Sequence, residues 1–519
     1  MSKPFCKPLE RLARCTAMVL GASILVGSLA APSPVSAQSK RSGEPGVIGT
    51  SNPAGFRAWI RSFEGEARRA GIPRSIYQQA FADVRLNNAV LERDARQPEF
   101  ATPIWDYLGL LVSDTRIGNG RRALAQYRGL LDRISERYGV PPEIVTAIWG
   151  IESNYGVNRG SFGVIEALAS LGYEGRRDKW ARGQLIDALK VLKNGDTTSD
   201  RMIGSWAGAM GHTQFIPSSY QSHAVDFDGD GRRDIWADDP TDALASTANY
   251  LFANGWRTGE PWGYHVMLPP NFNYALVQGG RLPLSEWAAM GVRLADSTDL
   301  PMQYNDAELI LPAGASGPAL LTLNNFRTIL RYNNATSYAL AVSLLAEQIS
   351  GQPPRKFRWP NGVRSLSRTD VKELQGLLTQ LGFDTGGIDG LLGRNSRSAI
   401  RDFQRSRGLV PDGFPSDKLL DQVRQAVAIK DAPISLGRST SATAVEPDQA
   451  DAGPASRADI REMQVLLTGL GFDTKGIDGR IGRNTRAAIF AFERNAGLSA
   501  RGQPSVELLT ALRRVARGE

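Results

Sequence analysis

Cysteine and histidine are scarce in this 519-residue chain. The two cysteines are Cys6 and Cys15, so the sequence after them supports neither a disulfide nor a cysteine nucleophile. The three histidines are His212, His223 and His265, and none belongs to an H-E-x-x-H pattern. These shortages exclude thiol enzymes and disfavour zinc hydrolases, because zinc sites rely on histidine and cysteine ligands.

Long apolar runs are also missing after the N-terminal segment, which has the layout of a secretory signal peptide. Basic residues come first, an apolar run extends from Ala17 to about Ala31, and small residues at Val35 to Ala37 suit a cleavage site. The apolar run is short for a membrane span, which needs about 20 residues. We therefore expect residues 1–37 to be a cleaved signal peptide for export to the periplasm, with no stable membrane anchor. An uncleaved N-terminal anchor is the alternative.

Positive charge is in modest excess, with a formal net charge of +8. The basic residues are spread along the chain and do not form runs, which argues against nucleic acid as a partner. An anionic polymer or surface outside the cytoplasm fits an exported chain better.

Composition divides the chain into linkers and helical segments. Residues 38–52 are polar and rich in Gly, Ser and Pro, which is typical of a linker. From 53 to 351 apolar residues recur at spacings of three and four, which predicts a mainly helical domain. Some extended structure or long loops are expected over 262–315, where Pro, Gly and Asn are frequent. Residues 352–365 predict a second linker.

An internal repeat occupies the C-terminal part of the chain. Residues 381–400 read LGFDTGGIDGLLGRNSRSAI and residues 470–489 read LGFDTKGIDGRIGRNTRAAI. The pattern predicts a three-helix unit at 366–428 and another at 457–517, joined by a polar linker over 429–456. Both units resemble the peptidoglycan-binding domain, which is a small three-helix bundle. A generic three-helix interaction module is the alternative.

Glu152 is the candidate acid. Pro142 suits the first turn of a helix, and Gly156 suits its end. One apolar face of this helix contains Ile144, Val145, Ile148 and Ile151, and Glu152 falls on the same face. Apolar surroundings and the helix C-terminus both raise the pKa of a carboxyl group. A carboxylic acid that stays protonated near neutral pH can act as a general acid. A solvated glutamate on the rim is the alternative.

Several motifs follow Glu152 in a characteristic order. They are Ile151-Glu-Ser-Asn-Tyr-Gly156, Gly208-Ala-Met-Gly-His-Thr-Gln-Phe-Ile-Pro-Ser-Ser-Tyr220, Asp226-Phe-Asp-Gly-Asp-Gly231, Ala248-Asn-Tyr-Leu-Phe-Ala-Asn-Gly-Trp256, and Arg331-Tyr-Asn-Asn leading to Tyr338. With these motifs the chain resembles the lytic murein transglycosylases of the B family. The resemblance implies a mainly α fold, with a lysozyme-like helical catalytic domain and two small three-helix peptidoglycan-binding domains.

The resemblance also implies roles for particular residues. Glu152 matches the single catalytic acid/base, and substrate contacts are expected at Arg176, Arg177, Ser205, Gln214, Tyr250, Asn333 and Tyr338. Each has a plainer alternative: the arginines fit a solvated basic turn, Gln214 a capping or core-satisfying amide, and Tyr250 core packing. A tyrosine is common in the family where this chain has His212, and we expect a structural role for this histidine.

The activity implied by the resemblance is cleavage of the bond between N-acetylmuramic acid and N-acetylglucosamine without water. Glu152 would act first as acid and then as base, and the product would carry a 1,6-anhydro ring. Peptidoglycan strands are the expected partner, no cofactor is required, and proteins of wall synthesis or division are candidate partners. A hydrolytic muramidase on the same fold, which usually needs a second carboxylate, is one alternative. A non-catalytic peptidoglycan-binding scaffold is the other.

An acidic loop matches the start of a calcium-binding loop. Asp226, Asp228 and Asp230 alternate before Gly231, Arg232 offers its carbonyl oxygen, and Asp234 and Asp239 complete the predicted ligands for a structural calcium ion. The usual glutamate at the twelfth position is replaced by an alanine, and Asp239 suits a helix N-cap equally well. A metal-free Asp-Gly turn is the alternative.

Overall fold

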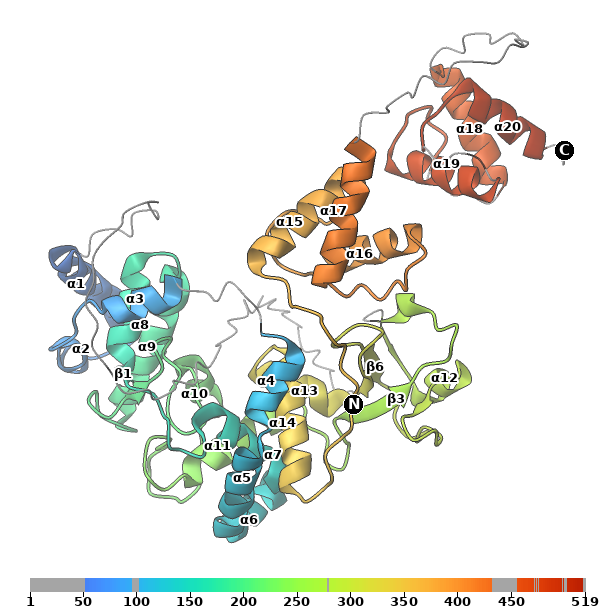
Figure 1. Ribbon diagram of the computed structural model, residues 1–519. Helices are drawn as coiled ribbons and strands as arrows, with labels where there is room; N and C mark the ends of the chain where they lie inside the picture. The colour runs from blue at the N-terminus through green and yellow to red at the C-terminus, as the bar shows by residue number, and fades with distance from the viewer. Residues whose placement is uncertain are drawn as a thin grey trace, which may run out of the picture. The chain divides into compact units, whose positions relative to one another are not determined.

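The computed structural model describes residues 52–95, 102–277, 280–431 and, apart from 471, 473, 475, 497 and 499–501, residues 455–516. The chain divides into two compact units, residues 1–432 and 433–519, which are treated separately below (Figure 1). The predicted signal peptide and nearly all of the linkers at 38–52 and 429–456 lie outside the described residues. Among the described helices, none combines the length and apolar character that crossing a membrane requires.

Five helices build a first core in the N-terminal half. They are α1 (Pro53–Arg69), α2 (Arg74–Phe81), α3 (Asn88–Ala95), α8 (Val164–Glu174) and α9 (Asp178–Asn194). The side chain of Asn52 begins α1 by accepting hydrogen bonds from the first free N–H groups of the helix. Phe56 and Phe63, two turns apart on α1, are fully buried in one cluster with Leu185 and Leu189 of α9.

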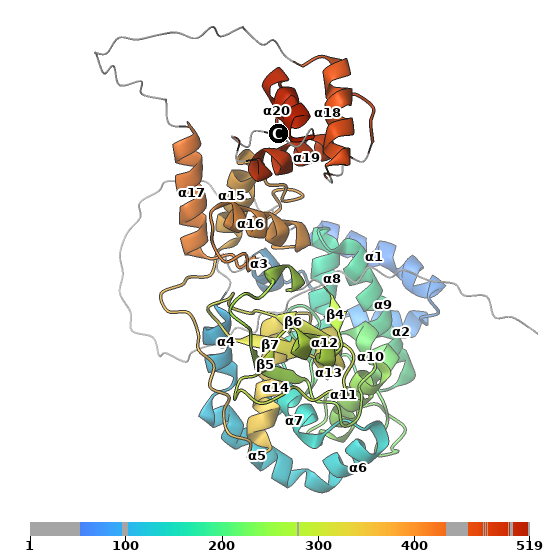
Figure 2. The same cartoon turned by 90° about the vertical axis from the view of Figure 1, so that its right-hand side faces the viewer.

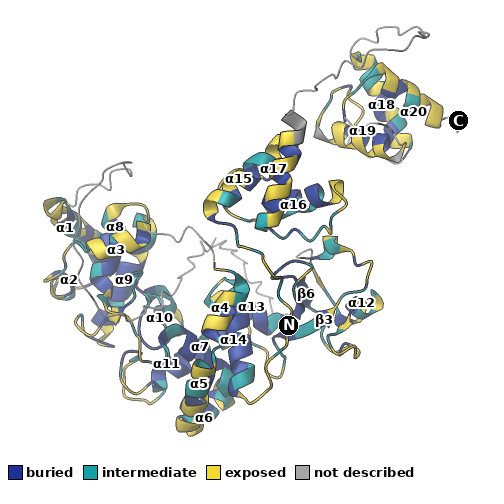
Figure 3. Ribbon diagram, viewed as in Figure 1, coloured by how far each residue is buried: buried dark blue, intermediate teal, exposed yellow. Residues whose placement is uncertain are grey.

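A second core surrounds the segment that contains Glu152. Its helices are α4 (Ile104–Leu111), α5 (Asp114–Gln126), α6 (Arg128–Tyr138), α7 (Pro142–Ser153), α11 (Thr241–Ala253), α13 (Asn324–Tyr332) and α14 (Thr336–Ile349). Helix α7 packs against α14, α5, α11 and α6, and residues 144–151 are all buried. Figure 3 shows α7 and α14 as largely buried helices. A helix that is apolar all round is stable only when it is enclosed in this way.

Short strands and loops connect these two cores. Strand β1 (Phe162–Gly163) pairs antiparallel with β2 (Ile203–Gly204), and α10 (Pro217–His223) follows. The chain then passes through the acidic loop before it enters α11.

A five-stranded antiparallel sheet provides the extended structure expected over 262–315 (Figure 2). The strand order is β4-β6-β7-β3-β5. The strands are β3 (Gly263–Met267), β4 (Arg281–Leu282), β5 (Arg293–Leu294), β6 (Ala307–Ile310) and β7 (Ala319–Thr322). The short helices η1 (Tyr274–Leu276) and α12 (Leu284–Ala289) lie in the connections, and Trp287 of α12 is fully buried in the core of this subdomain.

The two repeats form three-helix bundles, as predicted. The first contains α15 (Arg368–Gln380), α16 (Arg394–Ser406) and α17 (Asp417–Asp431), and the second contains α18 (Arg457–Gly469), α19 (Arg483–Asn495) and α20 (Val506–Ala516). Gln375 and Gln464 are buried at equivalent positions, and each accepts a hydrogen bond of 2.8 Å from the glycine N–H of its Ile-Asp-Gly turn. The mainly α fold class is therefore confirmed.

Candidate active site

Helix α7 fixes the position of Glu152. Pro142 opens the helix at a position where its missing N–H is not needed. The helix ends at Ser153, three residues before the expected Gly156, because Asn154 already adopts the left-handed conformation with φ 52°. Glu152 therefore lies in the last turn, where the partial negative charge of the helix C-terminus disfavours a carboxylate.

Glu152 has a strongly perturbed pKa. Part of its side chain is accessible to solvent, but protein surrounds the carboxyl group, and burial raises its pKa to about 7. The hydroxyl of Tyr338 donates a hydrogen bond of 2.5 Å to Oε1 of Glu152, which lowers the pKa and opposes part of this shift. The balance leaves a carboxyl group that can gain or lose a proton near neutral pH.

A group of tyrosines surrounds this carboxyl. Tyr338 stacks on Tyr332, with ring centroids 6.5 Å apart, and Tyr332 in turn contacts the edge of Tyr250. The hydroxyl of Tyr332 donates to the carbonyl of Thr213 at 2.6 Å. Burial, and then the charge of Glu152, raise the pKa of Tyr332 and Tyr338 well above the usual value. Both phenols therefore remain neutral hydrogen-bond donors.

Sequence reasoning did not name Tyr107 of α4 or Tyr332 as site residues. Burial, and then the charge of Glu152, raise the pKa of Tyr107 to about 12, which places this phenol within the electrostatic range of the acid. Among the described residues, no aspartate or glutamate is a cause of the shift of Glu152. The geometry therefore provides one carboxyl group with neutral phenols around it.

His212 holds the end of α7 in place. Its Nδ1 accepts a hydrogen bond of 3.1 Å from the indole of Trp149, and its carbonyl accepts one of 2.5 Å from Ser153. Its Nε2 lies 2.7 Å from the carbonyl of Ala237, so the geometry fits a neutral ring that donates from Nε2. Burial lowers the pKa of His212, which favours the same neutral form.

The two predicted substrate arginines meet a buried aspartate. Asp94 of α3 forms ion pairs with both Arg176 and Arg177, and its side chain is only 2% exposed. The guanidinium of Arg177 also lies over the ring of Trp206. Arg176 remains about half exposed, so this pair is a fixed cationic corner between α8 and α9 rather than a solvated turn. No local pattern in the sequence marks Asp94 as the partner.

Ser205 and Gln214 bind the backbone of their own loops. The Oγ atom of Ser205 accepts from the N–H groups of Ala207 and Ala209. The amide of Gln214 donates to the carbonyls of Arg159 and Gly211, and its φ of 54° is unusual for a residue other than glycine.

Tyr250 and Asn333 lie next to the tyrosine group. Tyr250 donates to the carbonyl of Arg331 at 2.5 Å and contacts Tyr332. The Oδ1 atom of Asn333 is buried and has no hydrogen-bond partner within the described residues. Thus, among the predicted substrate residues, Tyr338 contacts Glu152 directly, and Tyr250 is linked to it through Tyr332 and Tyr338.

The acidic loop brings three of its carboxylates together. Oxygen atoms of Asp226, Asp228 and Asp230 lie within 4.8 Å of one another, and all three residues are exposed. Each of these three also accepts a backbone N–H of the loop. Of the other predicted ligands, Asp234 accepts from the N–H groups of residues 236 and 237, and Asp239 accepts from the N–H and hydroxyl of residue 241 at the start of α11.

Asp242, which sequence reasoning missed, supports this loop from α11. Its buried carboxylate accepts from the N–H groups of Phe227 and Asp234. Burial is the main cause that raises the pKa of Asp242 to about 6. The backbone N–H of Arg232 donates a hydrogen bond to Asp230. The carbonyl oxygen of Arg232 is the atom predicted to bind calcium.

Comparison with known protein families matches both parts of the chain. The transglycosylase SLT domain family matches residues 55–347, which is more than half of the chain. The putative peptidoglycan binding domain family matches residues 367–423 and 456–512.

Individual proteins and solved structures agree with these matches. The membrane-bound lytic murein transglycosylase B of Escherichia coli (strain K12) is 34% identical over 272 residues, which are 51% of this chain and 73% of that protein. The crystal structure of SltB3 from Pseudomonas aeruginosa in complex with NAG-anhNAM-pentapeptide has a TM-score of 0.70 and 48% identity, and the match covers 71% of this chain and 99% of that one. The Escherichia coli lytic transglycosylase Slt35 in complex with calcium has a TM-score of 0.50 and 31% identity, over 58% of this chain and 93% of that one.

The raised pKa of Glu152 predicts a pH-dependent cost in stability. In the folded chain the pKa is about 7, whereas an unfolded glutamate has a pKa of about 4.3. The contribution of protonated Glu152 to the free energy of unfolding is therefore fully present below pH 4 and is lost as the pH rises through 7. We expect Glu152→Gln to raise the free energy of unfolding of the catalytic domain more at pH 8 than at pH 4, by up to about 4 kcal/mol.

Calorimetric melting of both proteins across this pH range measures the effect. Glu136→Gln, at an exposed position on α6, controls for the loss of one negative charge. A melting difference that stays constant from pH 4 to pH 8 would contradict the assignment.

The hydrogen bond from Tyr338 predicts the direction of a second shift. Tyr338→Phe removes a donor to the carboxylate, so the pKa of Glu152 should rise further above 7. Infrared difference titration can follow the carboxyl band that Glu152→Gln removes. Tyr250→Phe, whose hydroxyl serves the carbonyl of Arg331, should leave this pKa unchanged. A lower pKa in Tyr338→Phe would show that the phenol acts otherwise.

Proposed function

The chain belongs to the transglycosylase SLT domain family and is a lytic transglycosylase of peptidoglycan, and we propose that Glu152 is both the acid and the base of its reaction. The observation that carries this proposal is one buried carboxyl group whose pKa of about 7 allows proton transfer in both directions. Its direct hydrogen bond comes from the neutral phenol of Tyr338.

In the first step, protonated Glu152 donates its proton to the oxygen between N-acetylmuramic acid and N-acetylglucosamine. The bond from C1 of the muramic acid to this oxygen breaks, and the N-acetylglucosamine end leaves as an alcohol. The carboxylate that remains accepts the hydrogen bond of Tyr338, which stabilises the charge formed at this moment.

In the second step, the C6 hydroxyl of the same muramic acid attacks C1. Glu152 takes the proton of this hydroxyl and returns to its starting state, so no water is consumed. The product is a 1,6-anhydro ring. An intramolecular nucleophile has a high effective concentration, which removes the need for a second carboxylate to activate water.

The predicted substrate residues are assigned by their surroundings. Arg176 and Arg177, held by Asp94, offer positive charge to anionic groups of the peptide stems. The unpaired Oδ1 of Asn333 offers an acceptor for a sugar hydroxyl or amide. Ser205 and Gln214 would act by holding their own loops in place, because their side chains already bind backbone groups.

Two alternatives have less support. A hydrolytic muramidase usually needs a second carboxylate to position water, and none among the described residues perturbs Glu152. A non-catalytic scaffold would not need a carboxyl group whose pKa is held near 7 by burial and one phenol. Binding of peptidoglycan by the repeats is compatible with either activity.

Export to the periplasm is proposed because the substrate is a wall polymer and because residues 1–37 have the pattern of a signal peptide. Wall-synthesis and division proteins share that compartment and are candidate partners.

A structural calcium ion is proposed for the acidic loop. Carboxylate oxygens are the ligands that calcium prefers, and Asp226, Asp228 and Asp230 lie close enough together to share one ion. The carbonyl of Arg232, with Asp234 and Asp239, would complete the set, although both of these carboxylates also accept backbone hydrogen bonds. Bound calcium would offset part of the negative charge of the loop and fix the start of α11, and no step of the reaction passes through it.

The catalytic proposal predicts the products of Glu152→Gln. Loss of a general acid lowers the rate roughly 10²–10⁴-fold. The rate at which 1,6-anhydro fragments are released from purified sacculi should therefore fall by at least about 10²-fold. Mass spectrometry of the fragments measures both rate and product. Glu143→Gln, in the first turn of the same helix, is the matched control.

Two results would contradict the proposal. Wild-type fragments that end in reducing sugars would favour the muramidase. Digestion by the Glu152→Gln protein at the wild-type rate would show that Glu152 is not the catalytic acid.

The calcium proposal predicts a metal-dependent gain in stability. Extracellular calcium modules bind with dissociation constants of about 10⁻⁴–10⁻³ M, and a tenfold excess over such a constant stabilises by about 1.4 kcal/mol. Calorimetric melting with and without calcium should show this gain in the wild type and its loss in Asp230→Asn. Asp132→Asn, an ion-paired aspartate of α6, is the control. An equal response in all three proteins would show that the loop is not the site.

A further inference from the structure

The first repeat contacts the sheet subdomain of the catalytic domain at the loop between two of its strands. This loop, residues 313–317, lies between β6 and β7. The N–H of Ala315 donates a hydrogen bond of 2.8 Å to Oδ2 of Asp412, which precedes α17 in the first repeat. Both segments belong to the same compact unit of the chain.

Gly314 makes this approach possible. A Cβ atom at Gly314 would lie 2.7 Å from the Asp412 carboxylate and 2.8 Å from Cβ of Phe414, closer than such contacts occur. Its φ of 71° also favours glycine. Two independent features of one residue therefore suit close packing of the repeat against the loop.

Asp412 is held in place from inside the repeat. Its Oδ1 accepts from the amide of Gln404 at 2.7 Å and from the N–H of Phe414 at 2.9 Å. The other end of Gln404 accepts from the N–H of Gly413 at 2.9 Å. These bonds leave Oδ2 of Asp412 directed to Ala315, so the contact does not have to order a mobile side chain.

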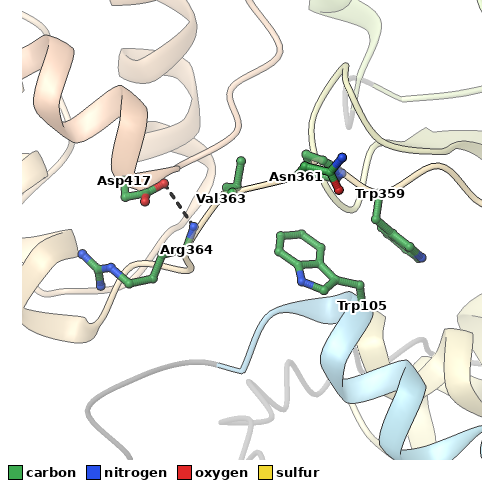
Figure 4. A pocket seen from close by; sticks show the side chains of 8 residues that line it. Trp105, Trp359, Asn361, Val363, Arg364 and Asp417 are labelled. Carbon is green, nitrogen blue, oxygen red and sulfur yellow. Dashed lines mark hydrogen bonds between the residues drawn. The ribbon is translucent and has the colours of Figure 1, made fainter.

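The segment between the two domains is anchored at both ends. Arg355 forms a two-point ion pair with Glu347 of α14, and its guanidinium lies over the ring of Trp262. Further along, the N–H of Arg364 donates to Asp417, as the dashed line in Figure 4 shows.

Aromatic packing adds to this anchoring. Trp359 lies against Trp105 of α4, with ring centroids 6.1 Å apart, and both line a pocket at the junction (Figure 4). The predicted linker over 352–365 is thus held at Arg355, Trp359 and Arg364, and most of its other residues are exposed.

The second repeat has different residues at the docking positions. At the offset of 89, Asp412 corresponds to Arg501, Phe414 to Gln503 and Gln404 to Glu493. Arginine has no acceptor for the N–H of Ala315, and it reverses the charge. Residue 501 lies outside the described residues, so this comparison is one of sequence.

One hydrogen bond behind the docking positions is nevertheless shared by the two repeats. Glu493 accepts from the N–H of Gly502 at 2.7 Å, as Gln404 does from Gly413 in the first repeat. The exchanges therefore change the residues of the docking positions and keep this hydrogen bond.

We infer that the two repeats have diverged, so that the first is a docking module fixed on the 313–317 loop through Asp412 and Phe414, and the second cannot occupy that place. The partner surface is the loop of the same chain, which offers a backbone N–H and a glycine surface. A fixed module and a tethered one would have different uses on an insoluble polymer. The fixed module holds wall material at a set distance from Glu152, and the tethered one raises local concentration. This consequence rests on the proposed function, whereas the docking itself does not.

Paired spin labels test the docking in the full-length chain, with Cys6 and Cys15 replaced by serine. Ser285→Cys on α12 is combined either with Gln425→Cys on α17 or with Arg514→Cys, the equivalent position on α20. We expect a narrow distance distribution for the first pair and a broad one for the second. Equally broad distributions, or a narrow one for the second pair, would overturn the inference.

Exchanging residues between the repeats tests the contact. Asp412→Arg with Phe414→Gln gives the first repeat the residues of the second at the two positions that face the loop, and the 285–425 distribution should become broad. Arg501→Asp with Gln503→Phe, the reverse exchange, is the control and should leave it narrow. A narrow distribution after the first exchange would show that these side chains do not hold the repeat.

Activity tests the consequence separately. The Asp412→Arg, Phe414→Gln protein should digest insoluble sacculi several-fold more slowly and cleave short soluble glycan fragments at the wild-type rate. Loss of both activities would contradict the consequence. If the proposed function itself were wrong, the Glu152→Gln protein would digest sacculi at the wild-type rate, which is a different result.

Discussion

The enclosure of α7 is the constraint on which the site depends. Residues 144–151 are buried on every side, so the helix is stable only when other helices surround it completely. This packing brings α14 alongside α7, and with it the phenol that reaches Glu152. The last turn of a helix held in this way has little freedom. The acid is therefore positioned by the folding of the whole second core and not by a local motif.

Two opposed effects set the pKa of Glu152, the proposed catalytic acid. Burial raises the pKa of Glu152, and the hydrogen bond from Tyr338 lowers it, with a result of about 7. A group with a much higher pKa would hold its proton too tightly to give it up, and one with a much lower pKa would not be protonated when the substrate binds. The same burial keeps Tyr338 a neutral phenol, so the partner can donate but does not compete for the proton.

Sequence pattern predicted Glu152 because the cause is local: helix phase and a chain of adjacent motifs are both visible along the sequence. It did not predict Tyr107 or Asp94, whose roles arise only when distant segments meet. Asp94 lies more than 80 residues before the arginines it holds, and nothing in its own helix marks it. The end of α7 was placed three residues late because Asn154 takes the left-handed conformation that glycine usually adopts.

Comparison of the two repeats shows which positions the three-helix fold keeps the same and which it allows to differ. Gln375 and Gln464 make the same bonds in the two copies, because the glycine N–H that each accepts from is buried and would be costly to leave unpaired. Position 412 is less constrained: Asp412 accepts from the amide of Gln404 and the N–H of Phe414, but the buried N–H of Gly413 is satisfied by Gln404 and the corresponding N–H of Gly502 by a glutamate. A half-buried residue that does not pair with the glycine N–H of the turn can differ in charge between two copies of the same fold. The change from Asp412 to an arginine in the second repeat therefore alters which surface a repeat can bind. In our proposal the 313–317 loop binds the first repeat and not the second.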